Sequence, residues 1–360
     1  MSKGNRTKEM VAVDLGSSCL RVVVGKAVPG GMALRKVLGI PISVGLYGNG
    51  DIANYQELRS VLSECVKENG LKGHPAVFTF SSIGSVTRVV EVPNVKQEEM
   101  KGLVDFEIQQ FLPADIGAYI TQYKVIGKPE KDAKTVKVMA ATIPRVIAED
   151  LIRLCRECDL EPACLDIHTN AISKLLKASG SLNDSQVHAE QRVALVELGN
   201  LITEISIYEE GEYQLSRRVL LGGHQVDQRI SMVFDVSPDE ARMEKHRPLN
   251  INEEVFEYTE ENRVFNTLKT GVDEWIAEIE KVVKFYNSRK PDAKVEKCYL
   301  YGGGASVMGI DRYVSKVLGI PTEVVRGIGA VNGPNAPDAD HLHLYLNAVG
   351  ALHRLEESKR

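Results

Sequence analysis

The chain has 360 residues, of which 43% are hydrophobic and 26% are charged. This composition is typical of a globular protein and excludes a disordered, collagen-like or coiled-coil chain; at about 150 residues per domain, the length predicts about two domains. The formal net charge of −5 supplies no basic field, so we expect no nucleic acid partner and no attraction to an anionic membrane. Any phosphate ligand must then be held by local geometry.

No stretch of the sequence approaches the ~18 apolar residues that span a bilayer, and residues 1–10 are polar and charged. We therefore expect an unprocessed cytoplasmic protein with no direct membrane insertion. The six cysteines are compatible with a reducing compartment. Cys155 and Cys158 form a CxxC pair within 145–159, where apolar residues recur at helical spacing. We interpret both thiols as core residues, with a zinc or redox site as the alternative.

Residues 11–25 predict a β-hairpin with a tip of small residues at Gly16, because two β-branched runs flank it. Residues 193–207 have the same construction, and Asp14 and Glu197 hold the same place in the two segments. This self-similarity indicates two related α/β halves, each opening with a hairpin whose tip faces a shared cleft.

The residues between the two hairpins predict a compact module inserted in the first half, at about 77–159. The expected elements are strands at 76–79, 87–92, 119–126 and 135–142, a helix at 96–112 that Pro113 ends, and the helix that carries the cysteines. After the second hairpin, the sequence predicts short helices at 226–234 and 237–246, an acidic segment at 255–262 and a long packed helix at 270–287.

The last third predicts a strand that ends in three consecutive glycines. A helix is expected from Ala305 and over 307–318, then a strand at 321–325 and a loop rich in glycine, proline, asparagine and aspartate at 327–340. The final helix, 341–357, has an apolar face rich in small residues, so we expect it to dock onto the fold. A membrane-surface anchor is the alternative for this helix.

Three glycine-containing turns are candidates for binding phosphate, because such turns direct several backbone N–H groups to one point. The candidate residues are Gly16, Ser17, Ser18, Cys19 and Arg21 in the first turn, Gly199, Asn200 and Thr203 in the second, and Gly302, Gly303, Gly304 and Ala305 in the third. Asp14 and Glu197 precede the first two turns, where carboxylates could hold a hydrated Mg²⁺. Each turn alone is equally an ordinary hairpin, but three of them with two matched acids favour a nucleotide clamp.

Segments 11–21, 193–206 and 299–309 resemble the first phosphate motif, the second phosphate motif and the adenosine motif of the actin/Hsp70/sugar-kinase superfamily. Segments 92–113 and 136–167 are similar to patterns of one family within it, the PilM family of actin-like type IV pilus assembly proteins, which are relatives of the division protein FtsA. The resemblance runs from about residue 10 to residue 355. It implies an α/β fold of the actin-like ATPase class, with two RNase H-like domains around a nucleotide cleft and an FtsA/PilM-type subdomain inserted in domain I.

The resemblance also implies how the chain is divided and what it binds. Domain IA would comprise 8–82, 160–190 and 341–360, the inserted subdomain IC 83–159, domain IIA 191–225 and 297–340, and subdomain IIB 226–296. ATP with Mg²⁺ is expected between the domains, with Gly222, Gly223 and Lys245 as further contacts. A groove on domain I would receive the short cytoplasmic N-terminal peptide of a PilN-like inner-membrane protein. That partner would hold the chain peripherally at the inner membrane, and self-assembly is left open.

Three positions depart from the family pattern and bear on catalysis. Glu197 stands where the second phosphate motif usually begins with Asp, and its extra methylene shifts a metal or a water from the in-line position. His168 lies where relatives place an acid or amide that orients the attacking water, a role that it fills only as a neutral, suitably turned ring. Arg242 replaces the glutamate expected to hold the ribose. With Glu197 and His168 as the catalytic candidates, we therefore expect ATP binding with weak or absent hydrolysis.

Two alternatives stay open from the sequence. One is an FtsA-like division protein that reaches the membrane through its last helix. The other is a metabolite kinase of the same superfamily, which needs a base in the cleft to activate a substrate hydroxyl. For that base the sequence offers His168 and no convincing Asp beside it.

Overall fold

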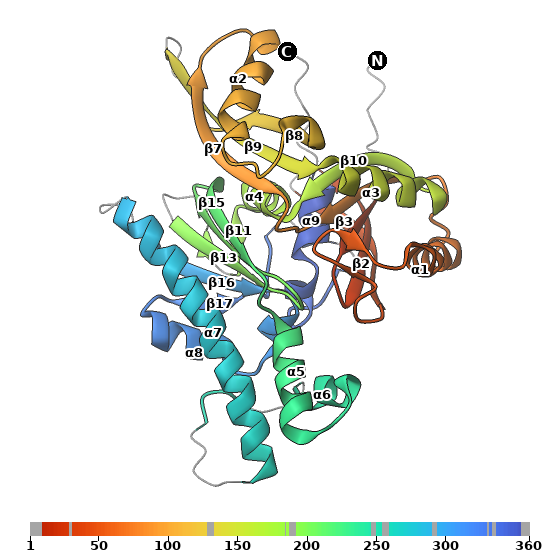
Figure 1. The fold of residues 1–360 in the computed structure, drawn as a ribbon, viewed down its shortest axis with the longest axis vertical. Coiled ribbons are helices and arrows are strands. Elements are labelled where there is room, and N and C mark those ends of the chain that lie inside the picture. Colours follow the sequence, from red (N-terminus) through yellow and green to blue (C-terminus); the bar gives the residue numbers. More distant parts are fainter. Residues whose placement is uncertain are drawn as a thin grey trace.

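The computed structural model shows two α/β halves side by side, with one module standing above them and a helical arm below (Figure 1). Within the part of the chain that the structure describes, no helix has the length and apolar character needed to cross a membrane. The described residues are 9–28, 31–127, 133–183, 185–186, 192–245, 250–253, 259–289, 294–329, 331–332 and 336–353.

The first half contains a six-stranded sheet with the strand order β10-β6-β1-β2-β3-β18. Its strands are β1 (Met10–Leu15), β2 (Cys19–Val28), β3 (Gly31–Pro41), β6 (Pro75–Phe80), β10 (Glu161–Ile167) and β18 (Val331–Asn332). Antiparallel pairs join β1, β2 and β3, whereas β6 runs parallel to β1 and β10 parallel to β6. Strand β18 corrects the loop expected at 327–340, because it pairs in parallel with Met32 and Ala33 of β3.

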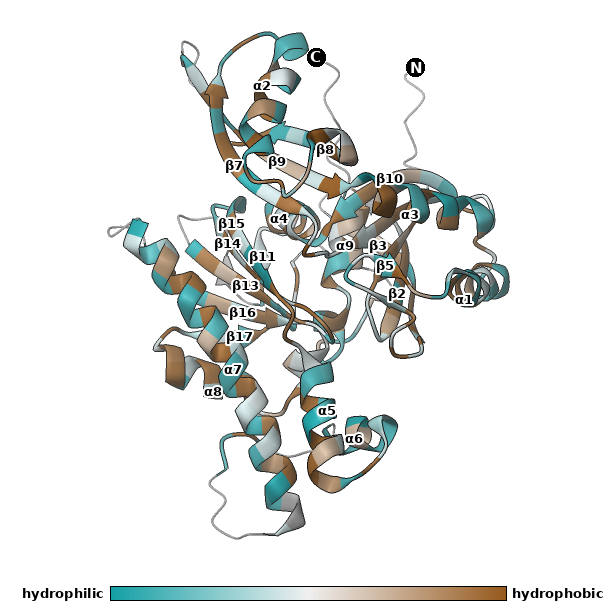
Figure 2. Ribbon diagram, viewed as in Figure 1, coloured by the Kyte–Doolittle hydropathy of each residue, from teal (hydrophilic) through white to brown (hydrophobic). Residues whose placement is uncertain are grey.

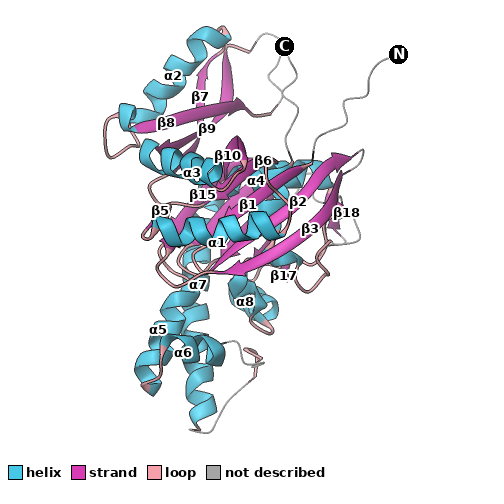
Figure 3. Cartoon of the chain, turned by 90° about the vertical axis from the view of Figure 1, so that its right-hand side faces the viewer, coloured by secondary structure: helices cyan, strands magenta, loops and turns pink. Residues whose placement is uncertain are grey.

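Helices cover both faces of this sheet. Because successive side chains of a strand point to opposite faces, β1 contributes apolar residues to a core on each side. The helices of this half are α1 (Tyr55–Glu68), α3 (Arg145–Glu157), α4 (His168–Ser179) and α9 (Leu346–Leu352). Val11 and Val13 share a core with α1 and α3, whereas Ala12 shares one with α4 and α9. Figure 3 shows α1 lying across the first of these faces. Cys155 and Cys158 are buried in the same core as Val11, which confirms that they are core residues.

The second half contains a five-stranded sheet with the order β15-β14-β13-β16-β17. Its strands are β13 (Arg192–Leu198), β14 (Thr203–Glu209), β15 (Glu212–Val219), β16 (Lys297–Tyr301) and β17 (Thr322–Val324). Antiparallel pairs join β13, β14 and β15, and parallel pairs join β13, β16 and β17. Short pairs β4 (Tyr47–Gly48) with β5 (Asp51–Ile52), and β11 (Ser181–Leu182) with β12 (Ser185–Gln186), complete the strands of the described ranges.

Helices also cover both faces of the second sheet. Its own helices are α5 (Gly223–Phe234), α6 (Pro238–Lys245), α7 (Glu260–Arg289) and α8 (Ile310–Leu318). Trp275 and Ile279 of α7 pack in one core with Val196, whereas Leu195 packs on the opposite face in the core that holds α4 and α9. Helices α4 and α9 of the first half therefore also pack against the second sheet and join the two halves. Figure 2 shows largely apolar central strands and an α7 that alternates between apolar and polar residues.

The inserted module forms its own antiparallel sheet in the order β7-β9-β8. Its elements are β7 (Val86–Pro93), α2 (Gln97–Gln109), the 3-10 turn η1 (Ile116–Ala118), β8 (Tyr119–Val125) and β9 (Thr135–Pro144). Met100, Val104 and Ile108 of α2 pack against this sheet. The helix ends before Pro113, as the sequence predicts, because a proline cannot continue it.

The C-terminal third differs from its sequence expectation in two places. The helix expected from Ala305 is divided into the 3-10 turn η2 (Gly303–Ser306) and α8, because Gly309 adopts a left-handed φ of 77° between them. The final helix is shorter than expected, since η3 (Leu342–Leu344) precedes α9. All described residues of α9 are buried, which confirms that this helix docks onto the fold. Residues 354–357 of that expected helix and 255–258 of the acidic segment lie outside the described ranges.

Candidate functional site

The two halves enclose a cavity of about 270 Å³ that all three glycine turns line. The predicted site residues that line it are Asp14, Gly16, Ser17, Ser18, Arg21, His168, Glu197, Gly199, Asn200, Gly223, Lys245, Gly302, Gly303 and Gly304. Cys19, Thr203, Gly222 and Ala305 are not among the lining residues and lie behind the turns. The fold thus gathers residues from both ends of the chain at one place.

The first turn has no room for a side chain at its glycine. A Cβ on Gly16 would lie 2.6 Å from the carbonyl oxygen of Cys19, so the backbone closes tightly and leaves Ser17 and Ser18 at the cavity. The Cys19 thiol donates a hydrogen bond to the carbonyl oxygen of Leu20. Because burial also raises the pKa of this thiol, Cys19 supports the turn as a neutral side chain.

The second turn has the same shape and touches the first. A Cβ on Gly199 would lie 2.4 Å from the carbonyl oxygen of Ile202. Asn200 Nδ2 donates a hydrogen bond to Ser17 Oγ at 3.3 Å. The two tips therefore meet across the cavity, as the repeated hairpin predicts.

Thr203 and Gly222 shape the second turn from behind. Thr203 Oγ1 donates to the carbonyl oxygen of Leu221 at 2.6 Å, which holds the following segment against the turn. A Cβ on Gly222 would lie 2.4 Å from the carbonyl oxygen of Asn200. Both residues thus position the cavity wall without facing the cavity themselves.

The third turn is anchored by a histidine. Gly302 directly follows β16 and has a left-handed φ of 85°, and a Cβ on Gly304 would lie 2.7 Å from the side chain of Leu198. His343 accepts the N–H of Gly302 on its carbonyl oxygen at 2.9 Å, and its Nε2 lies 2.9 Å from Ser306 Oγ. Burial lowers the pKa of His343 to about 4, helped by nearby positive charge, so its ring is neutral at neutral pH.

Cationic side chains reach the cavity from α6 and β2. Lys245 Nζ lies 2.7 Å from Asp227 Oδ1 and donates to the carbonyl oxygen of Gly223 at 3.1 Å. Burial lowers the pKa of Lys245, and the Asp227 carboxylate opposes that shift. Arg242, on the same helix, lines the cavity together with Arg21. Two guanidinium groups, of Arg21 and Arg242, thus line the cavity, whereas the charge of Lys245 is paired with Asp227.

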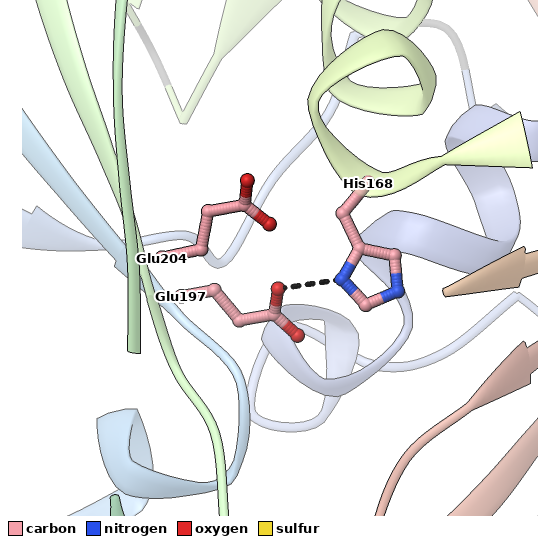
Figure 4. A group of neighbouring side chains, drawn as sticks. All are labelled: His168, Glu197 and Glu204. Atoms are coloured by element: carbon pink, nitrogen blue, oxygen red, sulfur yellow. Dashed lines mark hydrogen bonds and ion pairs between the residues drawn. The ribbon is translucent and has the colours of Figure 1, made fainter. Parts of the chain in front are cut away.

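His168 bridges the two acids at the centre of the site. It is the first residue of α4, and its Nδ1 lies 2.8 Å from Glu197 Oε2 (Figure 4). Its other nitrogen, Nε2, lies 2.9 Å from Asp14 Oδ1. Asn347 of α9 donates through Nδ2 to the second Glu197 oxygen, Oε1, at 2.9 Å. A continuous series of hydrogen bonds therefore links side chains from four elements, β1, α4, β13 and α9.

The protonation of His168 follows from these contacts. Burial by itself would lower the pKa of His168, but the carboxylates of Glu197 and Asp14 raise it well above its ordinary value. The ring is therefore an imidazolium that donates through both nitrogens. The neutral ring required of a water-orienting His168 is not present in this arrangement.

Glu204 stands beside this chain and has its own partners. It lies opposite Glu197 in the β13–β14 register, and ligand-type atoms of His168, Glu197 and Glu204 lie within 4.8 Å of one another (Figure 4). Glu204 is bound by Arg218 Nε at 3.3 Å and by Ser81 Oγ at 2.9 Å. The expected metal pair, Asp14 and Glu197, is thus separated by the ring of His168, and Glu197 has a second acid, Glu204, directly opposite it on the next strand.

Several lining residues were not predicted. They include Tyr47, Asn49, Ser81, Trp275, Tyr301, Leu344 and Asn347. Tyr301 directly precedes the third turn, so its position was readable from the motif. The other six carry no motif, because the folding of distant segments alone brings them to the cavity.

Comparison with known proteins places this site in a family. Residues 12–346 match the sequence pattern of a family described as "Type IV pilus assembly protein PilM". The chain belongs to this family. A curated relative is "Cell division protein FtsA" of Bacillus subtilis (strain 168), 20% identical over 274 residues, which are 76% of this chain and 56% of that protein. The chain therefore spans little more than half the length of that relative.

Solved structures share the fold. One described as "PilM-PilN type IV pilus biogenesis complex" covers 95% of this chain and 97% of its own, with a TM-score of 0.81 and 19% identity. MreB5 of Spiroplasma citri bound to AMPPNP covers 96% and 95%, with a TM-score of 0.56 and 12% identity. The ethanolamine utilization protein EutJ of Carboxydothermus hydrogenoformans covers 96% and 90%, at 0.55 and 15%. The predicted actin-like ATPase fold is confirmed.

Proposed function

We propose that this chain is a nucleotide-dependent interaction protein of type IV pilus assembly. ATP binds in the cleft, and the closed form docks the cytoplasmic N-terminal peptide of a PilN-like inner-membrane protein. The observation that carries the proposal is that three glycine turns from both halves line one cavity. Family membership and the likeness to a PilM–PilN complex support the pilus context. Nucleotide acts here by favouring one conformation.

The residues that line the cavity suit the different chemical groups of ATP. The backbone N–H groups at the first two turns, with Ser17 and Ser18, suit phosphate oxygens. The third turn has no side chains, so a purine or ribose can lie on its backbone, with Trp275 and Arg242 beside it. The carboxylates of Asp14 and Glu197 are oxygen ligands of the kind that Mg²⁺ prefers, reached through water. When bound, Mg²⁺ neutralises charge on the phosphates.

Hydrolysis is weak or absent in this proposal. A general base must accept a proton from water, and both nitrogens of His168 are already committed to Asp14 and Glu197. Glu197 is itself held on both oxygens, by His168 and by Asn347. The same hydrogen bonds argue against the metabolite-kinase alternative, because a kinase needs a side chain that is free to accept a proton from the substrate hydroxyl. The burial of α9 counts against the division protein, which needs a free terminal helix.

The division of the chain is also proposed. The two sheets support domain IA at 8–82, 160–190 and 341–360 and domain IIA at 191–225 and 297–340, except that β18 within the last range pairs with the first sheet. The separate antiparallel sheet supports subdomain IC, proposed at 83–159, as far as β9, whereas α3 at the end of that range packs in the core of the first half. Helices α5 to α7 support subdomain IIB at 226–296. Through its partner, the chain would be held peripherally at the inner membrane.

The test is calorimetry with ATP and Mg²⁺, followed by a synthetic PilN-like N-terminal peptide with and without ATP. ATP at a hundredfold its Kd would stabilise the fold by about 2.7 kcal/mol, and the peptide would bind more tightly with ATP. Gly303→Val is the blocking variant, because a Cβ there meets no atom within 4 Å and Gly303 lines the cavity. Gly102→Ala, on α2 with equally open space, is the control. Light scattering in the same samples records self-assembly.

Three results would contradict the proposal. The absence of both heat and a melting shift with ATP would show that the chain has no nucleotide site. Equal ATP binding by Gly303→Val and Gly102→Ala would show that the cavity is not that site. Peptide binding of equal strength with and without ATP would show that nucleotide does not control the partner.

A further inference from the structure

The charged groups that line the cavity are unevenly distributed. Of the described residues in its wall, only Asp14 and Glu197 carry a carboxylate, and both are bound by His168. Three cationic side chains line the same cavity, those of Arg21, Arg242 and Lys245. Within the described residues, no lining carboxylate is therefore left for the hydroxyl groups of a ribose.

The three cations have different surroundings. Lys245 is paired with Asp227 at 2.7 Å. The Arg21 guanidinium lies against the first turn, since a Cβ on Gly16 would lie 3.3 Å from its Nη1. Arg242 is one helical turn before Lys245 on α6 and so lies on the same face of that helix. It makes no hydrogen bond or ion pair with any residue that the structure describes, so its N–H donors are available to a ligand.

Arg242 also lies toward the third turn. Its neighbour Ala241 packs in the same core as Trp275 of α7, and a Cβ on Gly304 would lie 3.2 Å from the ring of Trp275. Helix α7 therefore connects α6 to the third turn, where the proposed function places the purine and the ribose. Arg21 belongs instead to the first turn, where it places the phosphates.

A guanidinium and a carboxylate favour different groups on a ribose. The ribose hydroxyls donate hydrogen bonds that a carboxylate accepts, whereas a guanidinium only donates. A phosphate on the ribose offers anionic oxygens, which a guanidinium binds in a bidentate manner. Dinucleotide-binding sites show the same difference, because an acid there holds the ribose 2′-hydroxyl and an arginine accommodates a 2′-phosphate. Arg242, which stands where a glutamate was expected, therefore suits a phosphorylated ribose.

We propose that Arg242 forms a subsite for a phosphate on the ribose, so that the cleft binds purine nucleotides phosphorylated at O2′ or O3′ more tightly than their unmodified counterparts. ATP binds in the same cleft and leaves this subsite empty. The inference rests on the proposed function, since it concerns the ribose of the same nucleotide. The phosphate turns and Mg²⁺ keep the roles given above.

The first measurement uses the unaltered full chain with Mg²⁺ at one ionic strength. Calorimetric competition against ATP gives the Kd values of AMP, adenosine 2′,5′-bisphosphate and adenosine 3′,5′-bisphosphate, which differ only in the ribose phosphate. We expect one bisphosphate to bind about tenfold or more tightly than AMP, because it gains a charge-assisted pair with the guanidinium. The tighter of the two identifies the ribose oxygen. A gain of less than about threefold for both bisphosphates would overturn the inference.

The second measurement compares substitutions at two arginines, in variants that thermal melts show to be folded. Arg242→Gln removes the charge, so we expect the bisphosphate to lose its advantage while the Kd of AMP changes by less than about threefold. Arg242→Glu introduces an acid and should make the bisphosphate bind more weakly than AMP. Arg21→Gln is the matched control, because it removes a guanidinium at the first turn. It should weaken AMP and the bisphosphate by the same factor and so preserve the advantage.

The outcomes separate this inference from the proposed function. Equal weakening of AMP and the bisphosphate by Arg242→Gln would show that Arg242 contacts the base or the 5′-phosphate, and would refute the inference alone. Loss of the advantage in Arg21→Gln as well would show a general attraction between charges, with the same consequence. Absence of ATP binding by the unaltered chain would refute the proposed function and this inference with it.

Discussion

The two sheets of the molecule repeat one arrangement. Starting from β10 the first sheet runs β10-β6-β1-β2-β3, and starting from β17 the second runs β17-β16-β13-β14-β15. Each has an antiparallel hairpin followed by a third antiparallel strand, with two parallel strands on the other side. Asp14 and Glu197 stand at the same place in β1 and β13. The duplication inferred from one pair of segments thus extends over most of each sheet.

The two halves differ in the residue that faces each acid. Asp14 pairs across its hairpin with Arg21, whereas Glu197 pairs with Glu204. The first half therefore places a cation opposite its acid within the hairpin, and the second half places a like charge there. The compensation for Glu197 comes from His168, in the other half. This difference makes the acid of the second half a link between the halves.

Glu204 extends the link to the inserted module. Its partner Arg218 donates from Nη1 to the carbonyl oxygen of Ser82 at 2.6 Å, and Ser81 donates to Glu204 at 2.9 Å. Both serines lie between β6 and β7, where the chain enters the module. The loop after β16, which is the equivalent place in the second half, is instead held by His343. A buried ion pair therefore joins the cleft to the entry of the module, whereas a histidine holds the equivalent loop of the second half.

Loss of that ion pair should have the largest effect. We expect Arg218→Met to lower the free energy of unfolding by about 3–5 kcal/mol, because it leaves the Glu204 carboxylate buried without its cation. The two side chains are 9% and 3% exposed. The neighbouring Arg217→Met is the control, since Arg217 is 51% exposed and its partner Glu278 keeps a second cation, Lys281; it should cost less than about 1 kcal/mol. Urea unfolding measures the free energy of unfolding of both variants. Equal losses in the two would show that the buried pair of Arg218 and Glu204 has no special role in the second half.

The hairpin tips should respond alike, which tests the repeat itself. Gly16→Ala and Gly199→Ala would each place a Cβ within 2.6 Å and 2.4 Å of a carbonyl oxygen. We expect each to cost about 1–3 kcal/mol, as overpacked sites do. Gly303→Ala meets no atom within 4 Å and should be neutral in the same thermal melts. If Gly199→Ala behaves like Gly303→Ala and unlike Gly16→Ala, the two tips are not equivalent.

The third prediction concerns pH and the loop after β16. Burial holds the pKa of His343 at about 4 in the folded chain, below the ordinary value near 6.5. Between these values the unfolded chain binds a proton that the folded chain does not, so stability falls as pH drops from about 6.5 towards 4, by up to about 1.4 kcal/mol per pH unit.

The free energy of unfolding is measured with urea between pH 7.5 and pH 5, a range that includes the ordinary histidine pKa of about 6.5. His343→Gln, which keeps a polar group beside Ser306, should show a shallower loss of stability on acidification. An unchanged slope in His343→Gln would show that the loop after β16 is not the acid-sensitive one.

Much of the fold was predictable because its signals are local. Alternating β-branched residues flank Gly16 and Gly199, so both hairpins and both tips follow from the sequence. The glycines at 302–304 likewise predict a turn at the end of a strand. The prediction of one helix from Ala305 was wrong, because Gly309 adopts a left-handed conformation that a glycine allows but does not require.

The sequence by itself determined the two repeated hairpins, the glycine turns and the acids at the strand ends, since each depends on residues close together in the chain. Only the tertiary structure decided what those acids touch. Asp14, His168, Glu197 and Asn347 lie on four elements that the sheet order and the packing of α4 and α9 between the sheets bring together. The sequence predicted a metal between two acids; the packing places a histidine there, because the residue nearest in space is not near in sequence.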